Sequence, residues 1–335
     1  MSGARPGLAR GLALALLFAL VAACVNLFVG RARLSPIDVM TALQGGDVSP
    51  TVHDIVHLDR VPRVVLGLAV GAALALAGTL FQALLRNPLA DPYIVGVGPG
   101  ALLGAAGAGA LGLAGRSVAG LSAAAGGAFV GAVLAALLVL GVAGRRGRDA
   151  SARLLLAGVA VGSFVTAVAT WALYVENESW QDAVRWLLGS LAYADGPRIR
   201  LAAGATVLLA LLAWLRARDL DALALGEESA RLAGVDVTRT VFGLSAAACL
   251  LVAAAVATAG LVGFVGLVVP HAARRLVGPG HRRLLPVAAL LGGGLLVAAD
   301  AIARSARTEV PVGVVTALLG APVFAVLLRR TSAPR

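Results

Sequence analysis

The stretch VVLGLAVGAALALAGTLFQALL, residues 64–85, is apolar throughout except for Thr79 and Gln82. A helix needs about 20 such residues to cross the hydrocarbon core of a membrane. The stretch therefore predicts a membrane-spanning helix. It is followed by RNPLADP, residues 86–92, and then by a second apolar stretch.

The two prolines of RNPLADP predict where one helix ends and the next begins. Asn87 precedes Pro88; the residue before a proline disfavours helix, and proline itself offers no N–H group. Asp91 followed by Pro92 is typical of a helix N-cap with proline at the first helical position. We expect a stiff, sharply turned corner between two membrane helices, and the plain alternative is an ordinary helix–helix turn.

The rest of the chain repeats this pattern of apolar runs between short polar breaks. Of the 335 residues, 59% are hydrophobic and 13% are charged, whereas soluble domains have about 25% charged residues. The expected fold class is an all-α polytopic membrane protein, organised as a single transmembrane domain over residues 1–335. About ten spans are expected, at 11–30, 64–85, 93–113, 118–141, 153–175, 199–215, 240–259, 261–277, 284–303 and 311–328.

The basic residues, all 28 of them arginine, are scattered in short clusters between the apolar runs. This distribution is typical of membrane topology signals and not of a nucleic-acid-binding face, so no nucleic acid partner is expected. With ten spans both termini share one side, and most arginines fall on that side, which predicts cytoplasmic termini. The absence of lysine excludes a P-loop, whose lysine must reach the phosphates.

The sequence holds no pattern that would bind a metal or support catalysis. The H-E-x-x-H pattern, cysteine–histidine metal spacing and the G-x-S-x-G elbow are all absent. Asp300 lies within a predicted span and Arg304 follows four residues later, which favours a structural ion pair over a proton relay. No metal and no cofactor are expected, and uphill transport would need energy from another protein.

Residues 216–239 form the longest polar connection on the expected cytoplasmic side. From Leu220 to Leu232 the pattern predicts one short amphipathic helix. The alternative interpretation is an ordinary interfacial helix that lies on the membrane surface.

Four segments of the chain resemble the FecCD-type permeases, the membrane subunits of ABC importers for ferric siderophores, haem and cobalamin. They are residues 59–104, 223–235 (LALGEESARLAGV), 260–286 and 299–330. The resemblance implies a type II ABC importer permease of ten helices in the bacterial cytoplasmic (inner) membrane. It also implies a homodimer, two copies of a cytoplasmic ATP-binding subunit and an extracytoplasmic substrate-binding protein.

The same resemblance implies roles for particular residues. Exposed arginines would dock the binding protein, because guanidinium groups make forked bonds to carboxylates. The docking residues are Arg60, Arg63 and Arg304; the residues coupling to the ATPase are Gly226, Glu227, Ala230, Leu232 and Gly234; those of the cytoplasmic gate are Asn87, Pro88 and Leu89. Gly226 and Gly234 would bound the coupling helix. One departure concerns the second inner constriction, which in relatives is often lined by small hydroxyl residues before the fifth span; here Ser151 is followed by Ala152.

A ferric siderophore is the expected cargo, with cobalamin and haem as alternatives within the family. Outside the family, the alternatives are a passive channel or structural membrane protein without an ATPase partner and, less favoured, a membrane enzyme. Residues 216–239 discriminate between a permease and a channel. Charge reversal at Glu227 would uncouple ATP hydrolysis from uptake in a permease and would leave the conductance of a channel intact.

Overall fold

The computed structural model describes residues 7–113, 116–118, 120–144, 150–175, 188–306 and 308–331, and most of them are helical. The first half contains α1 (Leu8–Phe28), α2 (Pro36–Leu43), α3 (Pro50–Asp54), the π-helix η1 (Ile55–Arg60), α4 (Val61–Leu84), the 3-10 helix η2 (Pro92–Val95), α5 (Val97–Ala110), β1 (Ser117–Val118), β2 (Leu121–Ser122), α6 (Ala123–Ala143) and α7 (Ala150–Val175). The second half contains α9 (Gly196–Leu215), α10 (Ala217–Ala224), α11 (Glu227–Leu232), α12 (Val237–Ala259), α13 (Val265–Val277), α14 (His281–Ser305) and α15 (Val312–Thr331).

A helix occupies each of the ten predicted spans, so the all-α membrane fold class is confirmed. Within the described residues, seven helices are long and apolar enough to cross a membrane. Helices α5 and α13 have only 14 and 13 residues. Neither helix alone has the roughly 20 residues needed to cross a membrane. The count of ten spans is therefore approximate.

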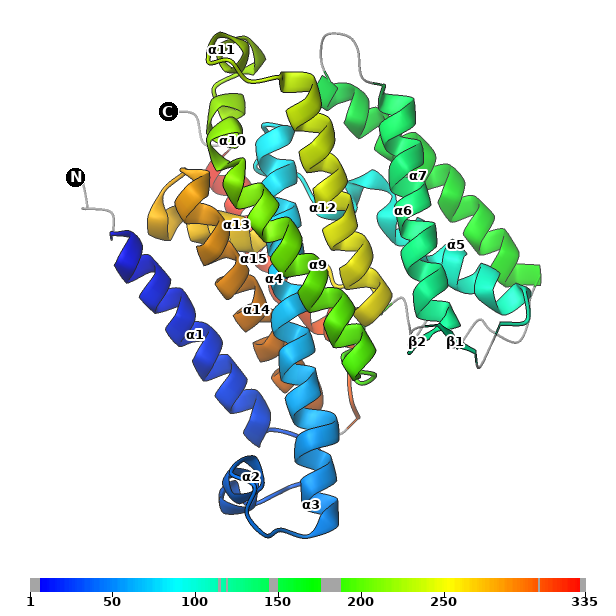
Figure 1. Ribbon diagram of the computed structural model, residues 1–335, viewed down its shortest axis with the longest axis vertical. Helices are drawn as coiled ribbons and strands as arrows, with labels where there is room; N and C mark the ends of the chain where they lie inside the picture. Colours follow the sequence, from blue (N-terminus) through cyan, green and yellow to red (C-terminus); the bar gives the residue numbers. More distant parts are fainter. Residues whose placement is uncertain are drawn as a thin grey trace.

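Helix α4 forms the centre of the bundle, and α1, α9, α12, α13 and α14 lie around it (Figure 1). Glycines allow this close packing, as is typical of membrane helices. A Cβ atom on Gly71 would lie 2.2 Å from the carbonyl oxygen of Gly292, and one on Gly78 would lie 1.8 Å from that of Gly266. The small residues of the predicted span 64–85 are thus the contact surface of the core.

Helices α5, α6 and α7 pack against one another at one side of the bundle (Figure 1). Before α6 the structure has a short antiparallel hairpin, in which Ser117 of β1 pairs with Ser122 of β2. The sequence did not predict this hairpin, and the helix expected from residue 118 begins at Ala123. Ser122 fixes that start, because its Oγ accepts a hydrogen bond from the N–H group of Ala125 at 3.3 Å.

The polar connection before α4 folds into the short helices α2 and α3. Ser35 and Ser49 cap them, each followed by a proline at the first helical position. The π-helix η1 then continues directly into α4, so helical structure runs unbroken from Pro50 to Leu84. Another long polar connection, residues 176–198, joins the expected spans 153–175 and 199–215. Most of it lies outside the described part of the chain.

Candidate functional site

The corner RNPLADP begins where α4 ends, through a hydrogen-bonded C-terminal motif. Arg86 has a positive φ of 49°. Its N–H group donates to the carbonyl oxygen of Ala83 at 3.2 Å, and that of Asn87 donates to the oxygen of Gln82 at 3.1 Å. This pattern is the Schellman motif, usually made with glycine at the left-handed position. The helix therefore stops one turn before Pro88, and the proline is not alone responsible.

Side chains then fix the rest of the corner. The Oδ1 atom of Asn87 accepts a hydrogen bond from the N–H group of Leu89 at 2.9 Å. The Oδ1 atom of Asp91 accepts one from Tyr93 at 2.8 Å, so the predicted N-cap is confirmed, although the helix that it starts is the single turn η2. Burial raises the pKa of the Asp91 carboxyl. The expected stiff corner is present, and the gate role of Asn87, Pro88 and Leu89 stays a prediction.

The connection 216–239 differs from the prediction of one amphipathic helix. It contains two helices, α10 and α11, which are separated at Gly226. Gly226 has a φ of 119°, a conformation that residues with a Cβ atom rarely adopt, and Gly234 has a φ of 81° after α11. The two glycines bound α11 as expected, but the helix predicted from Leu220 to Leu232 is interrupted by one of them.

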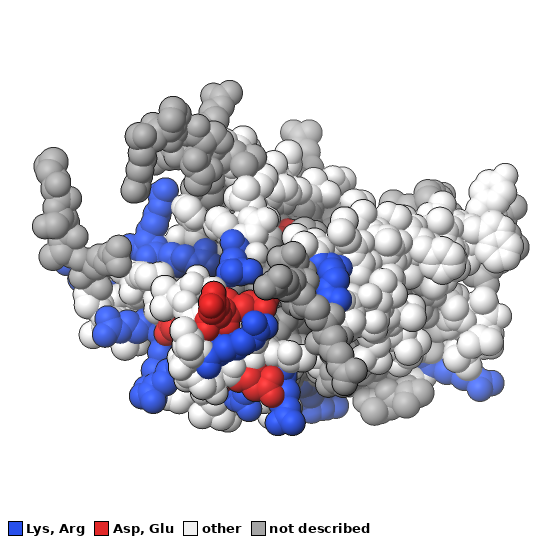
Figure 2. Space-filling model, turned by 90° about the horizontal axis from the view of Figure 1, so that it is seen from above, with Lys and Arg blue, Asp and Glu red and all other residues white. Residues whose placement is uncertain are grey.

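The surface around α11 combines exposed apolar side chains with paired charges. The side chains of Leu225 and Leu232, on either side of this short helix, are 79% and 86% exposed. Glu227 and Arg231 form an ion pair at 3.1 Å on its surface, and Ala230 is buried beneath it. Figure 2, which views this end of the molecule, shows acidic and basic side chains gathered together here, whereas the described surface over α5 to α7 is largely uncharged.

Helix α10 connects this surface to α14. Asp221 accepts a hydrogen bond from the N–H group of His281 at 2.9 Å, and the same Oδ1 atom lies 2.6 Å from the Nδ1 atom of that histidine. Asp221 therefore caps the start of α14 from another helix. Near α10, a Cβ atom on Gly226 would lie 4.0 Å from the guanidinium group of Arg86, so the connection 216–239, whose predicted role is coupling to the ATPase (the coupling loop), and the corner are adjacent.

The three predicted docking arginines lie at the other end of the bundle, and their expected exposure is wrong. Arg60, Arg63 and Arg304 are 1%, 6% and 3% exposed. They belong to a group of charges that we call the arginine cluster, in which the arginines and Asp300 are buried and two further carboxylates are partly exposed. It comprises Asp59, Arg60, Arg63, Asp300, Arg304 and Glu309.

Bonds within the chain account for the burial of these arginines. Arg60 donates to the carbonyl oxygens of Leu27 at 2.6 Å and Ala32 at 2.8 Å. Arg63 donates to Asp59 at 2.6 Å and to Glu309 at 2.7 Å. Buried charges need such partners, because an unpaired one would be very costly.

Arg304 is also enclosed, and its expected ion pair with Asp300 is confirmed at 3.0 Å. It also donates to the backbone and side-chain oxygens of Asn26, whose Nδ2 atom donates to Asp300 at 3.0 Å. The cluster thus joins α1, η1, α4, α14 and the segment before α15. The docking role of the three arginines stays a prediction.

Gln82 is a polar residue of the core for which sequence analysis predicted no role. Its Nε2 atom donates to the carbonyl oxygen of Leu267 at 3.2 Å, and its Oε1 atom accepts from Arg274 at 2.7 Å. Gln82 therefore ties α4 to α13 close to the corner. The only signal in the sequence was that it interrupts an otherwise apolar stretch.

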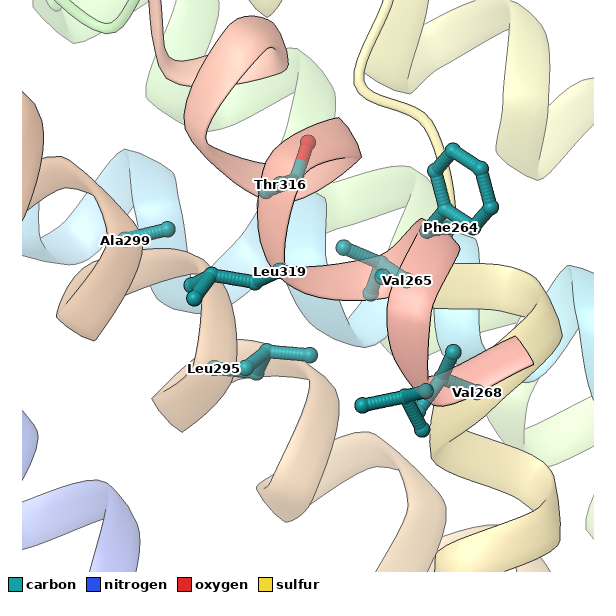
Figure 3. Close-up of a pocket in the computed structure, with 9 residues that line it drawn as sticks. Phe264, Val265, Val268, Leu295, Ala299, Thr316 and Leu319 are labelled. Carbon is teal, nitrogen blue, oxygen red and sulfur yellow. The ribbon is translucent and has the colours of Figure 1, made fainter. Parts of the chain in front are cut away.

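A small apolar pocket of about 100 Å³ lies between α13, α14 and α15. Figure 3 shows Phe264, Leu295 and Leu319 around it, and Phe264 has a positive φ of 66°. The pocket is below the roughly 300–1,000 Å³ of ordinary ligand sites. It is too small for a large chelate, and within the described residues no cluster of histidine, cysteine and acidic side chains could hold a metal.

A profile of the FecCD transport family matches residues 16–330. The chain belongs to the FecCD transport family. The predicted resemblance is therefore confirmed over most of the sequence. This membership makes the chain a multi-pass permease subunit of an ABC importer and sets aside the passive channel, the structural protein and the membrane enzyme.

Two relatives and one solved structure are similar to this FecCD permease over most of its length. The cobalamin import system permease protein BtuC of Halobacterium salinarum is 46% identical, over 84% of this chain and 75% of its own length. The hemin transport system permease protein HmuU of Yersinia pestis is 39% identical, over 81% of this chain and 82% of its own. A structure described as an inward-facing ABC transporter of metal-chelate type has a TM-score of 0.81 and 29% identity, covering 96% of this chain and 99% of the other.

Proposed function

We propose that this permease imports cobalamin. The observation that carries the proposal is the relative named for cobalamin import, which shares more of its residues with this chain than the relative named for hemin does. Haem is the second candidate. The siderophore predicted from the sequence has less support, because the relatives reported above are named for cobalamin and hemin.

The surface around α11 is the proposed contact for two copies of a cytoplasmic ATP-binding subunit. Exposed leucines beside a charged helix suit a protein contact, because apolar side chains supply burial and charges set orientation. The side chain of Glu227 is held by Arg231 and so has a defined position. The predicted coupling residues Gly226, Glu227 and Leu232 therefore serve as a rigid docking element.

The corner RNPLADP is the proposed cytoplasmic gate. Its turns are closed by hydrogen bonds within the corner and to the last turn of α4, so it would move as a unit with that end of the helix. Gly226 lies beside Arg86, so a displacement of the coupling loop would reach the corner directly. The side chain of Ser151, at the proposed second constriction, lies outside the described part of the structure.

The end of the bundle that holds the arginine cluster is the proposed contact for an extracytoplasmic binding protein. Arg63 makes its short bonds to partners that reach the surface, since the side chains of Asp59 and Glu309 are 42% and 27% exposed. A glutamate of the binding protein would exchange with these carboxylates at Arg63. Arg60 and Arg304 would hold the surface in shape.

A homodimer in the cytoplasmic membrane with both termini in the cytoplasm completes the proposal. The beginning of α1 lies toward the same end of the bundle as α10 and α11 (Figure 1). This arrangement supports placing the N-terminus and the coupling loop on the same side of the membrane. Large apolar side chains of α7 and α15, among them Phe164 and Leu318, are exposed and available to a second copy.

Whole-cell uptake tests the cargo. A strain lacking this chain would be supplied with labelled cobalamin, hemin or ferric siderophore, with and without restoration of the chain. Restored, energy-dependent uptake of cobalamin is the expected result. Uptake of hemin or the siderophore alone would refute the cobalamin assignment, and a variant with Glu227→Arg serves as the uncoupled control.

A further inference from the structure

A groove of about 640 Å³ lies between α5 and α6 and is lined almost entirely by apolar residues. Its volume falls within the roughly 300–1,000 Å³ of small-molecule sites. Leu111, Val130, Leu134 and Leu138 line it, and each of these side chains is more than half exposed. On a membrane-spanning helix such a face meets either lipid or another protein.

The glycines of the groove fall into two groups. Gly104 and Gly131 are required by packing, because a Cβ atom on either would lie within 2.0 Å or 2.2 Å of a carbonyl oxygen of the facing helix. Gly107 and Gly126 also line the groove, but a Cβ atom on either would meet nothing within 4 Å. Helix packing therefore does not explain the second pair, whose lack of side chains keeps the groove open.

One end of the groove is polar, and two arginines lie near it, of which Arg198 is paired with Asp195 at 3.8 Å. Ser122 lines it, and its hydroxyl oxygen accepts from Ala125 and lies 3.5 Å from a guanidinium nitrogen of Arg198. Arg116 is exposed, and its carbonyl oxygen accepts a hydrogen bond from the N–H group of Ala123 at 2.9 Å. The Ser122 hydroxyl can still donate its proton, so this end offers the donors that a phosphate group needs.

The groove is longer than the hydrocarbon part of one membrane leaflet. From Ser122 to Leu138 a helix rises about 24 Å, at about 1.5 Å per residue. Half of the hydrocarbon core is about 15 Å thick. An acyl chain that starts beside Ser122 would therefore lie wholly within the groove.

We propose that this groove binds an anionic phospholipid, with one acyl chain along α6 and the phosphate beside Arg116 and Ser122. The charge of Arg116 selects an anionic headgroup, and the open glycines admit the chain. The proposal rests on the membrane-spanning fold and is independent of the cargo. A second protein chain on the same face is the competing occupant.

Native mass spectrometry of the full chain, delipidated in mild detergent, tests the proposal. The probes are phosphatidylglycerol and phosphatidylcholine with identical dioleoyl chains. The wild type should retain one phosphatidylglycerol at collision energies that remove phosphatidylcholine. Gly126→Leu, which fills the groove, should weaken retention about tenfold, and Gly107→Leu should do the same. Arg116→Gln should abolish the headgroup preference.

The matched control is Gly141→Leu, which adds the same side chain to an exposed position of α6 outside the groove, where a Cβ atom also meets nothing within 4 Å. It should bind lipid like the wild type. Unchanged retention in both groove variants, or equal losses in the control, would overturn the proposal. Loss of a dimer with unchanged lipid binding would also overturn it and would assign the face to a second copy. Equal melting temperatures in lipid-free detergent show that the variants are folded.

Discussion

Asp300→Asn should be among the most destabilising single changes in this permease. The substitution keeps the shape of the side chain and removes its charge. Asp300 is 2% exposed, and its partner Arg304 is 3% exposed at 3.0 Å. The arginine cluster holds three arginines and three carboxylates, so the change leaves one buried positive charge uncompensated. Breaking a buried pair in this way costs about 3–5 kcal/mol.

Glu309→Gln is the matched control within the same cluster. The Glu309 side chain is 27% exposed, so water can solvate the Arg63 guanidinium once the charge of Glu309 is removed. Asp59 still contacts that arginine. A partly exposed pair of this kind is worth about 1 kcal/mol or less. The expected order of stability is therefore wild type, then Glu309→Gln, then Asp300→Asn well below both.

Denaturant unfolding of the purified chain in detergent, followed by circular dichroism, measures this order. A double variant, Asp300→Leu with Arg304→Met, removes both charges and should recover part of the loss, because apolar replacement of a buried pair is often tolerated. If Asp300→Asn proves as stable as Glu309→Gln, the cluster is not a buried electrostatic unit and the reasoning fails.

Three further predictions concern the coupling loop and the corner. Glu227→Arg should abolish cobalamin uptake by proteoliposomes while ATP hydrolysis continues; uptake at the wild-type rate would exclude a coupling role. Gly226→Ala should destabilise the chain by more than about 1 kcal/mol because of its positive φ, whereas Gly243→Ala, within α12 and with open space around it, should stabilise it by about 0.5–1 kcal/mol. Burial raises the pKa of Asp91, so the folded state holds its proton more tightly, and stability is lost as pH rises through the folded pKa. Asp91→Asn keeps the acceptor for the N–H group of Tyr93. Its melting temperature should therefore equal that of the wild type below pH about 4 and exceed it at pH 7. A difference in melting temperature that does not change with pH would refute this.

Local chemistry in the sequence predicted the helices and the corner. Apolar runs identify membrane helices because unpaired backbone groups are costly in lipid, and a helix pairs these groups within one segment. Asn87, Pro88, Asp91 and Pro92 act within a few residues of themselves, so their effect could be read directly. The break at Gly226 also had a local signal, since Glu227 and Glu228 are typical of a new helix start.

The burial of the arginines could not be predicted in this way. Arg60 depends on carbonyl oxygens around residues 27–32, and Arg63 depends on Glu309, which lies 246 positions along the chain. The cap of α14 by Asp221 and the bond between Gln82 and Arg274 have the same origin. Each requires knowing which helices are neighbours, and composition and periodicity do not contain that information.

The arginine cluster also limits how this protein can be recombined. Its bonds draw on four separated stretches of sequence, at residues 26–32, 59–63, 300–304 and 309. A chimera in which one of these stretches comes from a parent with different residues there would leave a charge in the interior without its partner. Functional hybrids between this permease and its relatives should therefore inherit all four stretches from one parent, and gene shuffling that separates them should yield chains that fail to fold.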